Sequence, residues 1–157
     1  MAWLEGSILG HAMRSSGVWT YGLVNLTHIL GVSALFGSVL ALDLRLLGLW
    51  RDVPLVSVSG TTLPIARAGF VVAAVSGVGL LAAKATEYVG NPFLLIKFPA
   101  IAIALINVAV IERLPAWKAR VVREPHGAER RQLAIAAAVS LVSWLTAVAA
   151  GRMIGYW

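Results

Sequence analysis

The chain has 157 residues, of which 59% are hydrophobic and 13% charged, with a mean hydropathy of +0.84. A soluble domain carries charge on about 25% of its residues, so this composition excludes an ordinary soluble domain and indicates one integral membrane domain. The net charge is +6, but the cations lie in short stretches between apolar runs, which argues against nucleic-acid binding. No cysteine is present, which excludes disulfides, thiolate metal sites and iron–sulfur clusters.

The N-terminal residues precede the first apolar run. No basic leader followed by an apolar core occurs within residues 1–17, so we expect the N-terminus to be retained. Residues 3–14 are too short and too polar to span a bilayer, but their apolar side chains recur at helical spacing. This pattern predicts a short amphipathic helix at the membrane interface.

Residues 18–48 form the first predicted transmembrane helix, because the run carries no charge before Asp43 and is long enough to cross a bilayer. Small residues recur along it and would let neighbouring helices approach closely. His28 lies inside this run, where an ionisable side chain is costly and therefore a candidate for function. Tyr21 and Asn25 share a helix face with His28, and we expect that face to turn away from lipid.

Three further spans follow, separated by a proline- and glycine-containing loop, a tight turn and a basic loop. In order, we predict a loop over 51–66, a helix over 66–88, a turn over 90–92, a helix over 93–114, a loop over 115–131 and a helix over 132–154. The short turn predicts that the second and third spans are antiparallel neighbours. The expected fold is all-α, a four-helix transmembrane bundle with an N-terminal interfacial helix, in one domain over 1–157.

The cations predict the orientation in a bacterial inner membrane. Nine of the thirteen fall on the side of the two long loops, and four fall on the side of the termini: Arg14, Lys84, Lys97 and Arg152. The positive-inside bias therefore places both long loops in the cytoplasm and both termini in the periplasm.

Several motifs occur in order along nearly the whole chain. They are H-I-L-G at 28–31, D-L-R-L-L-G at 43–48, G-x-x-L-x-A-x-x-A-x-x-Y at 77–88, N-P-F-x-x-x-K at 91–97, Asn107, and S-L-x-x-W from Ser140 followed by G-R at 151–152. With these motifs the chain resembles an uncharacterised family of bacterial four-helix membrane proteins. It is more distantly similar to copper resistance protein D and to the four-helix membrane type of protoporphyrinogen oxidase, which also place a histidine in the first span and a lysine early in a later one.

His28 is compatible with several kinds of chemistry. Its imidazole could bind the iron of a b-type haem, hydrogen-bond a quinone or relay protons, or it could simply fix the packing of two helices. We expect haem first, because Gly31 and the other small residues would leave room for a flat ring between helices. Lys97, Arg152 and Lys84 fall on the outer side, where Lys97 and Arg152 could steer the propionates of a haem, while Lys84 suits ordinary snorkelling.

A second axial ligand is not evident, because no other histidine lies within a span. His11 of the interfacial helix, Met13 or His28 of a second copy could supply it, and otherwise the iron would be five-coordinate. A copper site built from His11, Met13 and His28 would have too few ligands in one place, so we rank it below haem. His126 lies in a long loop, where we expect it to be solvated.

Other polar residues within the spans have structural or functional interpretations. Asn107 suits an interhelical hydrogen bond or a ligand contact, and Trp144 suits packing within the bundle or against a bound ring. Asp43 needs a partner, for which Arg67 or Arg113 are candidates in an interfacial ion-pair network, with proton entry as the alternative.

Three functions stay open from the sequence. The first is a redox protein that binds b-type haem or a quinone through His28 and passes electrons to a periplasmic or membrane partner. The second is a non-redox transport or accessory subunit for a metal or small anion, in which His28 and Lys97 line a polar cavity. The third is a homo-oligomeric scaffold built on the small-residue faces.

Overall fold

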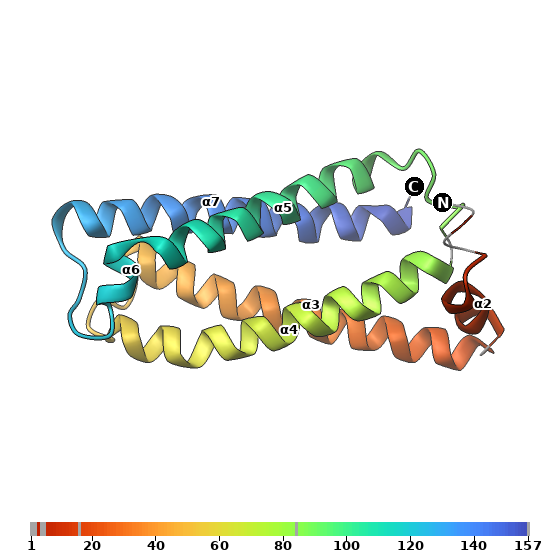
Figure 1. Cartoon of the computed structure of the whole chain (residues 1–157), viewed down its shortest axis with the longest axis horizontal. Helices are drawn as coiled ribbons and strands as arrows, with labels where there is room; N and C mark the ends of the chain where they lie inside the picture. The colour runs from red at the N-terminus through yellow and green to blue at the C-terminus, as the bar shows by residue number, and fades with distance from the viewer. Residues whose placement is uncertain (1–2, 4–5, 16, 84, 157) are drawn as a thin grey trace.

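The computed structural model describes residues 3, 6–15, 17–83 and 85–156. Regular structure in that part of the chain is helical throughout, and four of the helices are long and apolar enough to cross a membrane (Figure 1). The predicted fold, an all-α four-helix transmembrane bundle preceded by a short helix, is confirmed. The chain is therefore a multi-pass membrane protein.

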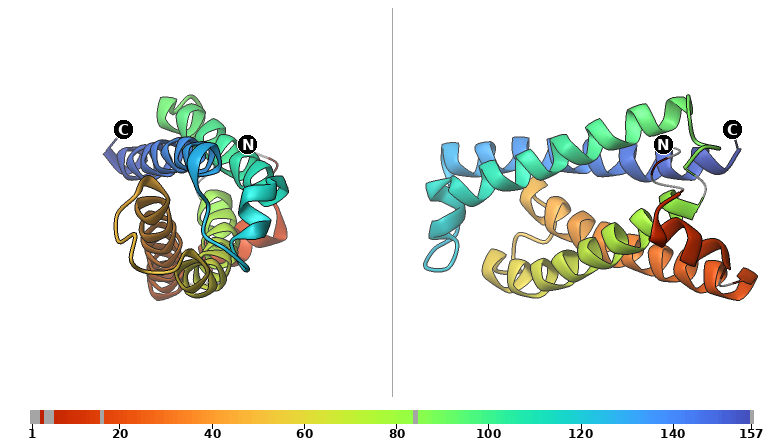
Figure 2. Two further views of the ribbon diagram at one scale, coloured as in Figure 1. Left: turned by 90° about the vertical axis from the view of Figure 1, so that its left-hand side faces the viewer. Right: turned by 45° about the vertical axis from the view of Figure 1, so that its right-hand side comes forward.

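Successive long helices run in opposite directions. They are α3 (Gly17–Leu47), α4 (Leu55–Ala83), α5 (Pro92–Arg113) and α7 (Gly127–Met153). The N-terminal helix and the last turns of α7 lie at one end of the bundle, which we call the terminal end (Figure 1). The connections after α3 and after α5 lie together at the opposite, loop end (Figure 2).

Shorter elements cover the two ends. They are α2 (Ile8–Ser15), α6 (Pro115–Ala119) and the 3-10 turn η1 (Ile154–Tyr156). α2 corresponds to the helix predicted over 3–14 but starts later, because Gly6 and Ser7 form a turn whose Ser7 hydroxyl accepts a hydrogen bond from the Gly10 N–H at 3.2 Å. Residues 4 and 5 of that predicted helix lie outside the described residues. α2 packs against α4 and α3 at the terminal end.

α4 begins at Leu55, so the prediction of a loop over 51–66 is wrong for most of its length. The hydroxyls of Thr61 and Thr62 donate to backbone carbonyls four residues earlier, at 3.2 and 2.9 Å, so these polar side chains are satisfied inside the helix. Pro64 removes one backbone N–H, a loss that transmembrane helices commonly tolerate. The turn-forming residues of this segment therefore do not interrupt the helix.

The other helix ends also differ from the predicted bounds. α4 ends at Ala83 rather than near residue 88, and Lys84 lies outside the described residues. α7 begins at Gly127 rather than 132, with Glu129 in its first turn, where the helix dipole favours a negative charge. The basic loop expected over 115–131 accordingly contains α6 and the first turn of α7.

The long helices form two pairs. α3 packs along α4, α5 packs along α7, and the contact between α3 and α7 joins the pairs. α4 and α5 are antiparallel, as predicted, but the connection between them is longer than the expected turn at 90–92, since turns already begin at residue 85. The two helices also make few contacts with each other in the described part of the chain. The bundle is therefore held together chiefly along one seam, between α3 and α7.

Glycines set the distance between α3 and α4. A Cβ atom added to Gly31 would lie 2.8 Å from the backbone nitrogen of Ala73, and one added to Gly69 would lie 2.6 Å from the backbone nitrogen of Leu35. Carbon atoms do not approach other heavy atoms so closely without a shift, and backbone cannot swing aside as a side chain can. The two backbones therefore meet at a contact that only glycine permits.

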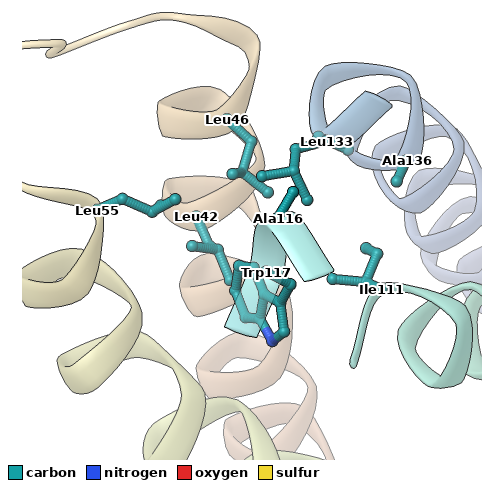
Figure 3. Packing of buried hydrophobic residues seen from close by; sticks show 9 residues of the cluster. Leu42, Leu46, Leu55, Ile111, Ala116, Trp117, Leu133 and Ala136 are labelled. Carbon is teal, nitrogen blue, oxygen red and sulfur yellow. The ribbon is translucent and has the colours of Figure 1, made fainter. Parts of the chain in front are cut away.

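Buried apolar side chains form two clusters. The first lies at the loop end, where Trp117 of α6 inserts among leucines of α3, α4 and α7 (Figure 3). The second lies further along the bundle, where Trp144 packs against Leu35, Ala66 and Ala104. Phe70 meets Trp144 edge to face, with ring centroids 6.4 Å apart. These two clusters hold the four long helices against one another.

Candidate functional site

His28 is half-buried on α3 and is anchored to α4. Its Nδ1 lies 2.9 Å from the carbonyl oxygen of Ala73 and 3.1 Å from Oγ of Ser76. The Ser76 hydroxyl itself donates to the carbonyl of Val72 at 2.5 Å. A carbonyl can only accept, so Nδ1 carries the hydrogen, and Nε2 of the neutral ring keeps its lone pair.

Gly77 of α4 packs against the ring of His28. A Cβ atom added to Gly77 would lie 3.0 Å from Cε1 of His28, so the imidazole rests directly on the α4 backbone. The expectation that Gly31 leaves room for a flat ring is wrong, because the backbone of α4 at Gly69 and Ala73 fills that space. Small residues here bring α3 and α4 together instead of opening a slot between them.

Lys97 comes close to His28 from the other helix pair. It lies in the second turn of α5, is half-buried, and its charge interacts with the imidazole of His28. Its Nζ would be 3.3 Å from a Cβ atom added to Gly151 of α7, so the missing side chain at Gly151 leaves the space that the ammonium uses. His28 and Lys97, two residues that the sequence singled out, therefore lie within electrostatic range of each other.

Arg152 follows Gly151 but makes a different contact. Its guanidinium lies 4.6 Å from the centroid of the Tyr156 ring and hydrogen-bonds the Tyr156 hydroxyl. Both side chains are exposed. Arg152 thus lies at the terminal end near Lys97, but it is held at the surface.

Tyr21 and Asn25, the two polar residues expected to share a face with His28, differ in their exposure. Tyr21 is half-buried, whereas Asn25 is exposed on the surface of the bundle. The face that was expected to turn inward as a whole does so only in part. His28 is the member of this face with observed contacts to a neighbouring helix.

Asn107 and Trp144 lie in the interior between α5 and α7. Nδ2 of Asn107 donates to the carbonyl of Ala136 at 2.9 Å, which joins the two helices. Trp144 is 5% exposed, and its Nε1 has no hydrogen-bond partner among the described residues. Both positions were candidates for ligand contact, and both have structural roles in the bundle.

A second axial ligand for His28 is not evident in the structure. The His11 side chain on α2 is exposed, and Met13 packs against α4, where its Sδ would be 3.7 Å from a Cβ atom added to Gly79. The described residues contain no group of three or more His, Asp or Glu side chains suited to a metal ion.

Asp43 does not form the predicted ion pair. Arg67 instead pairs with Glu112 at 3.0 Å, and Asp43 faces Ser140 of α7. Asp43 is only 3% exposed, and its Oδ2 has no partner within the described part of the chain. The expected network with Arg67 or Arg113 is therefore wrong, because Asp43 points into the seam between α3 and α7.

Glu124 is a structurally important residue that the sequence did not single out. One of its oxygens accepts from Arg45 at 3.0 Å, and the other accepts from the backbone N–H of Leu55 at 2.6 Å. It therefore ties the loop after α6 to the end of α3 and the start of α4. A glutamate in a basic loop gave no signal of this role, because its two partners lie 79 and 69 positions earlier.

The two best-defined cavities lie at the loop end. One cavity, of about 140 Å³, is lined by side chains from α3, α4, the loop after α6 and α7, among them Arg45 and Leu133. The other, of about 240 Å³, lies along α4 near Arg67 and Arg120. Neither is lined by His28 or Lys97. Both cavities therefore belong to a different part of the bundle from His28 and Lys97.

One comparison with known proteins gives a match. The model of a family of unknown function, DUF6644, matches residues 1–157. This agrees with the resemblance to an uncharacterised family, while the distant similarity to copper resistance protein D and to protoporphyrinogen oxidase stays a prediction. No curated protein and no solved structure matches the chain.

Proposed function

The chain belongs to the DUF6644 family, whose function is unknown, and from its own residues we propose that it is a membrane redox protein that binds b-type haem through Nε2 of His28. The observation that carries this proposal is the hydrogen bond from Nδ1–H to the Ala73 carbonyl. Histidines that ligate a metal through one nitrogen usually donate the other N–H in this way, which fixes the tautomer and the ring orientation.

Lys97 supports the same assignment. Its ammonium lies near His28 and on the terminal-end side of it, where it could hold a propionate of a haem bound at Nε2. Arg152 is close in sequence to Gly151 and could contribute once it leaves Tyr156. Haem would supply the one-electron chemistry, and these residues would bind and orient it.

A quinone is the second candidate ligand, and one observation favours it. The α4 backbone packs directly against Gly31, so no ring fits between α3 and α4 at that turn, and a smaller ligand is easier to place beside His28. A free Nε2 lone pair would accept the O–H of a quinol, a smaller ring that dissolves in the bilayer. In either case the protein would pass electrons to a periplasmic or membrane partner.

Absorption spectra test the haem proposal. The wild-type chain, produced with excess haem and purified in detergent, is expected to give a b-type spectrum that changes on reduction with dithionite. His28→Ala is expected to lose this spectrum, whereas His126→Ala is the matched control, because His126 is exposed in a loop far from the site. His11→Ala tests whether α2 supplies a second ligand.

The outcomes separate the two ligands. A wild-type protein without a Soret band, or a His28→Ala protein that keeps it, would overturn haem binding at this site. Quenching of tryptophan fluorescence by a short-chain ubiquinol would then support the quinone alternative if His28→Ala abolished it. If neither ligand binds, the non-redox interpretation of His28 and Lys97 as a transport or accessory site becomes the working hypothesis.

A further inference from the structure

A second possible ligand site lies at the loop end, far from His28. It is the cavity of about 140 Å³ where the end of α3, the start of α4, the loop after α6 and the first turns of α7 meet (Figure 1). Leu46, Leu55 and Leu133 form its apolar part, and all three are buried in the loop-end cluster. The cavity is therefore built on the rigid part of the bundle and not only from loop residues.

Arginines dominate the polar part of this cavity. Arg45, Arg51 and Arg130 line it, against one described acidic residue, Glu124, so these four side chains carry a net charge of three minus one, or +2. Arg45 is 6% exposed, and its Nε donates to the Val53 carbonyl at 2.7 Å. A buried, oriented guanidinium beside a cavity is a strong attraction for an anion.

Glu124 shows what kind of group this site accommodates. Its carboxylate accepts from both Arg45 and the first N–H of α4, a combination of guanidinium and helix N-terminus that binds anions. Glu124 neutralises Arg45 but not the other two arginines. Arg51 and Arg130 are exposed and form no ion pair with any residue that the structure describes.

We propose that this cavity binds a phosphate group, carried by an anionic lipid headgroup or by free phosphate. Arg51 and Arg130 bind the phosphate oxygens, and the ion pair between Arg45 and Glu124 forms a fixed part of the cavity wall. The site lies at the loop-end termini of the helices that are long enough to span a membrane. Basic pockets between transmembrane helices on the cation-rich side bind anionic lipid headgroups. The arrangement is independent of any ligand at His28.

Binding titrations on the full chain in detergent micelles test this site. The probes are dioctanoyl phosphatidylglycerol and inorganic phosphate, measured by calorimetry at low ionic strength. We expect saturable binding of one phosphate group per chain. Arg51→Gln and Arg130→Gln are each expected to weaken it about tenfold, because each removes a charge-assisted hydrogen bond.

Arg131→Gln is the matched control. Arg131 is exposed on the same turn of α7 and does not line the cavity, so its loss removes the same charge without touching the site. Binding of the lipid alone identifies a headgroup site, and equally tight binding of inorganic phosphate identifies a site for the free anion. Absence of saturable binding, unchanged affinity in Arg51→Gln and Arg130→Gln, or an equal loss in Arg131→Gln would overturn the proposal.

Discussion

At the scale of single residues, Asp43 is the clearest case of a polar group with an incomplete environment. Its carboxyl is buried in the seam between α3 and α7, where it faces Ser140 and Oδ2 has no described partner. An unpartnered carboxyl oxygen in such a place costs free energy. Its identity as an acid therefore needs a reason beyond stability.

Asp43→Asn tests whether the charge matters for stability. The amide keeps one oxygen for Ser140 and removes the charge, so we expect the free energy of unfolding to stay equal or to increase. Asp43→Ala loses the Ser140 contact and leaves a small cavity, so we expect a loss of about 1–3 kcal/mol. Reversible unfolding in mixed micelles measures both variants. Equal destabilisation by both would mean that the fold needs the negative charge itself.

The sequence predicted individual residues better than their partners. His28 and Lys97 were singled out because ionisable groups are costly inside a membrane, and they lie within electrostatic range of each other. The partner of Asp43 was wrong, since a sequence gives the position of a residue along a helix but not which neighbouring helix its face meets. The hydrogen bond of His28 to the Ala73 carbonyl agrees with the packing role considered for this histidine, but the sequence could not show which helix would supply the carbonyl.

At the scale of helices, the contact between α3 and α4 depends on two glycines. We expect Gly31→Ala and Gly69→Ala to lower the free energy of unfolding by about 1–3 kcal/mol each, because the added methyl group would overlap the backbone of the facing helix. Thermal unfolding followed by helical circular dichroism measures the loss. These substitutions should also disturb any ligand at His28, which lies one turn from Gly31 on the same helix.

Glycines elsewhere on the same helices serve as controls. Nothing lies within 4 Å of a Cβ atom added to Gly37 of α3 or Gly60 of α4. Gly37→Ala and Gly60→Ala are therefore expected to be neutral or to stabilise by up to about 1 kcal/mol through higher helix propensity. If all four alanine variants unfold alike, close packing at Gly31 and Gly69 is not what holds α3 against α4.

Helix bounds could be predicted where apolar runs were long, and not where turn-forming residues are tolerated inside a membrane helix. The segment around Pro64 contains glycine, threonines and proline, which indicate a loop in water. In α4 the threonine hydroxyls bond to the helix backbone, and Leu55 is fully buried against other helices. Tertiary packing thus overrides the local signal, and that packing cannot be seen in one segment of sequence.

At the scale of the whole molecule, the arrangement predicts which parts of the chain share a side of the membrane. Because the chain has no cysteine, single cysteines report position cleanly. Val89 and Val121 are both exposed, at the terminal and the loop end respectively. If the positive-inside bias holds, Val89→Cys should react with an impermeant maleimide in intact cells, and Val121→Cys only after the membrane is opened.

Detergent-solubilised protein gives the control for that experiment, because both cysteines should then react fully. Reaction of Val121→Cys alone in intact cells would reverse the proposed orientation and place the loop end outside. Reaction of both would contradict the placement of the two valines at opposite ends of the spans.

The pairing of the helices also has a consequence for biosynthesis. α3 and α4 are made consecutively and pack on each other, so this hairpin can assemble as soon as residue 83 has entered the bilayer. α5 emerges next but packs on α7 rather than on α4, and the partner of Asn107, the Ala136 carbonyl, is made 29 residues later. For that interval the amide is without its hydrogen bond in the bilayer. An insertion chaperone that shields the Asn107 amide is therefore expected to matter most while α5 is inserted and α7 is not yet synthesised.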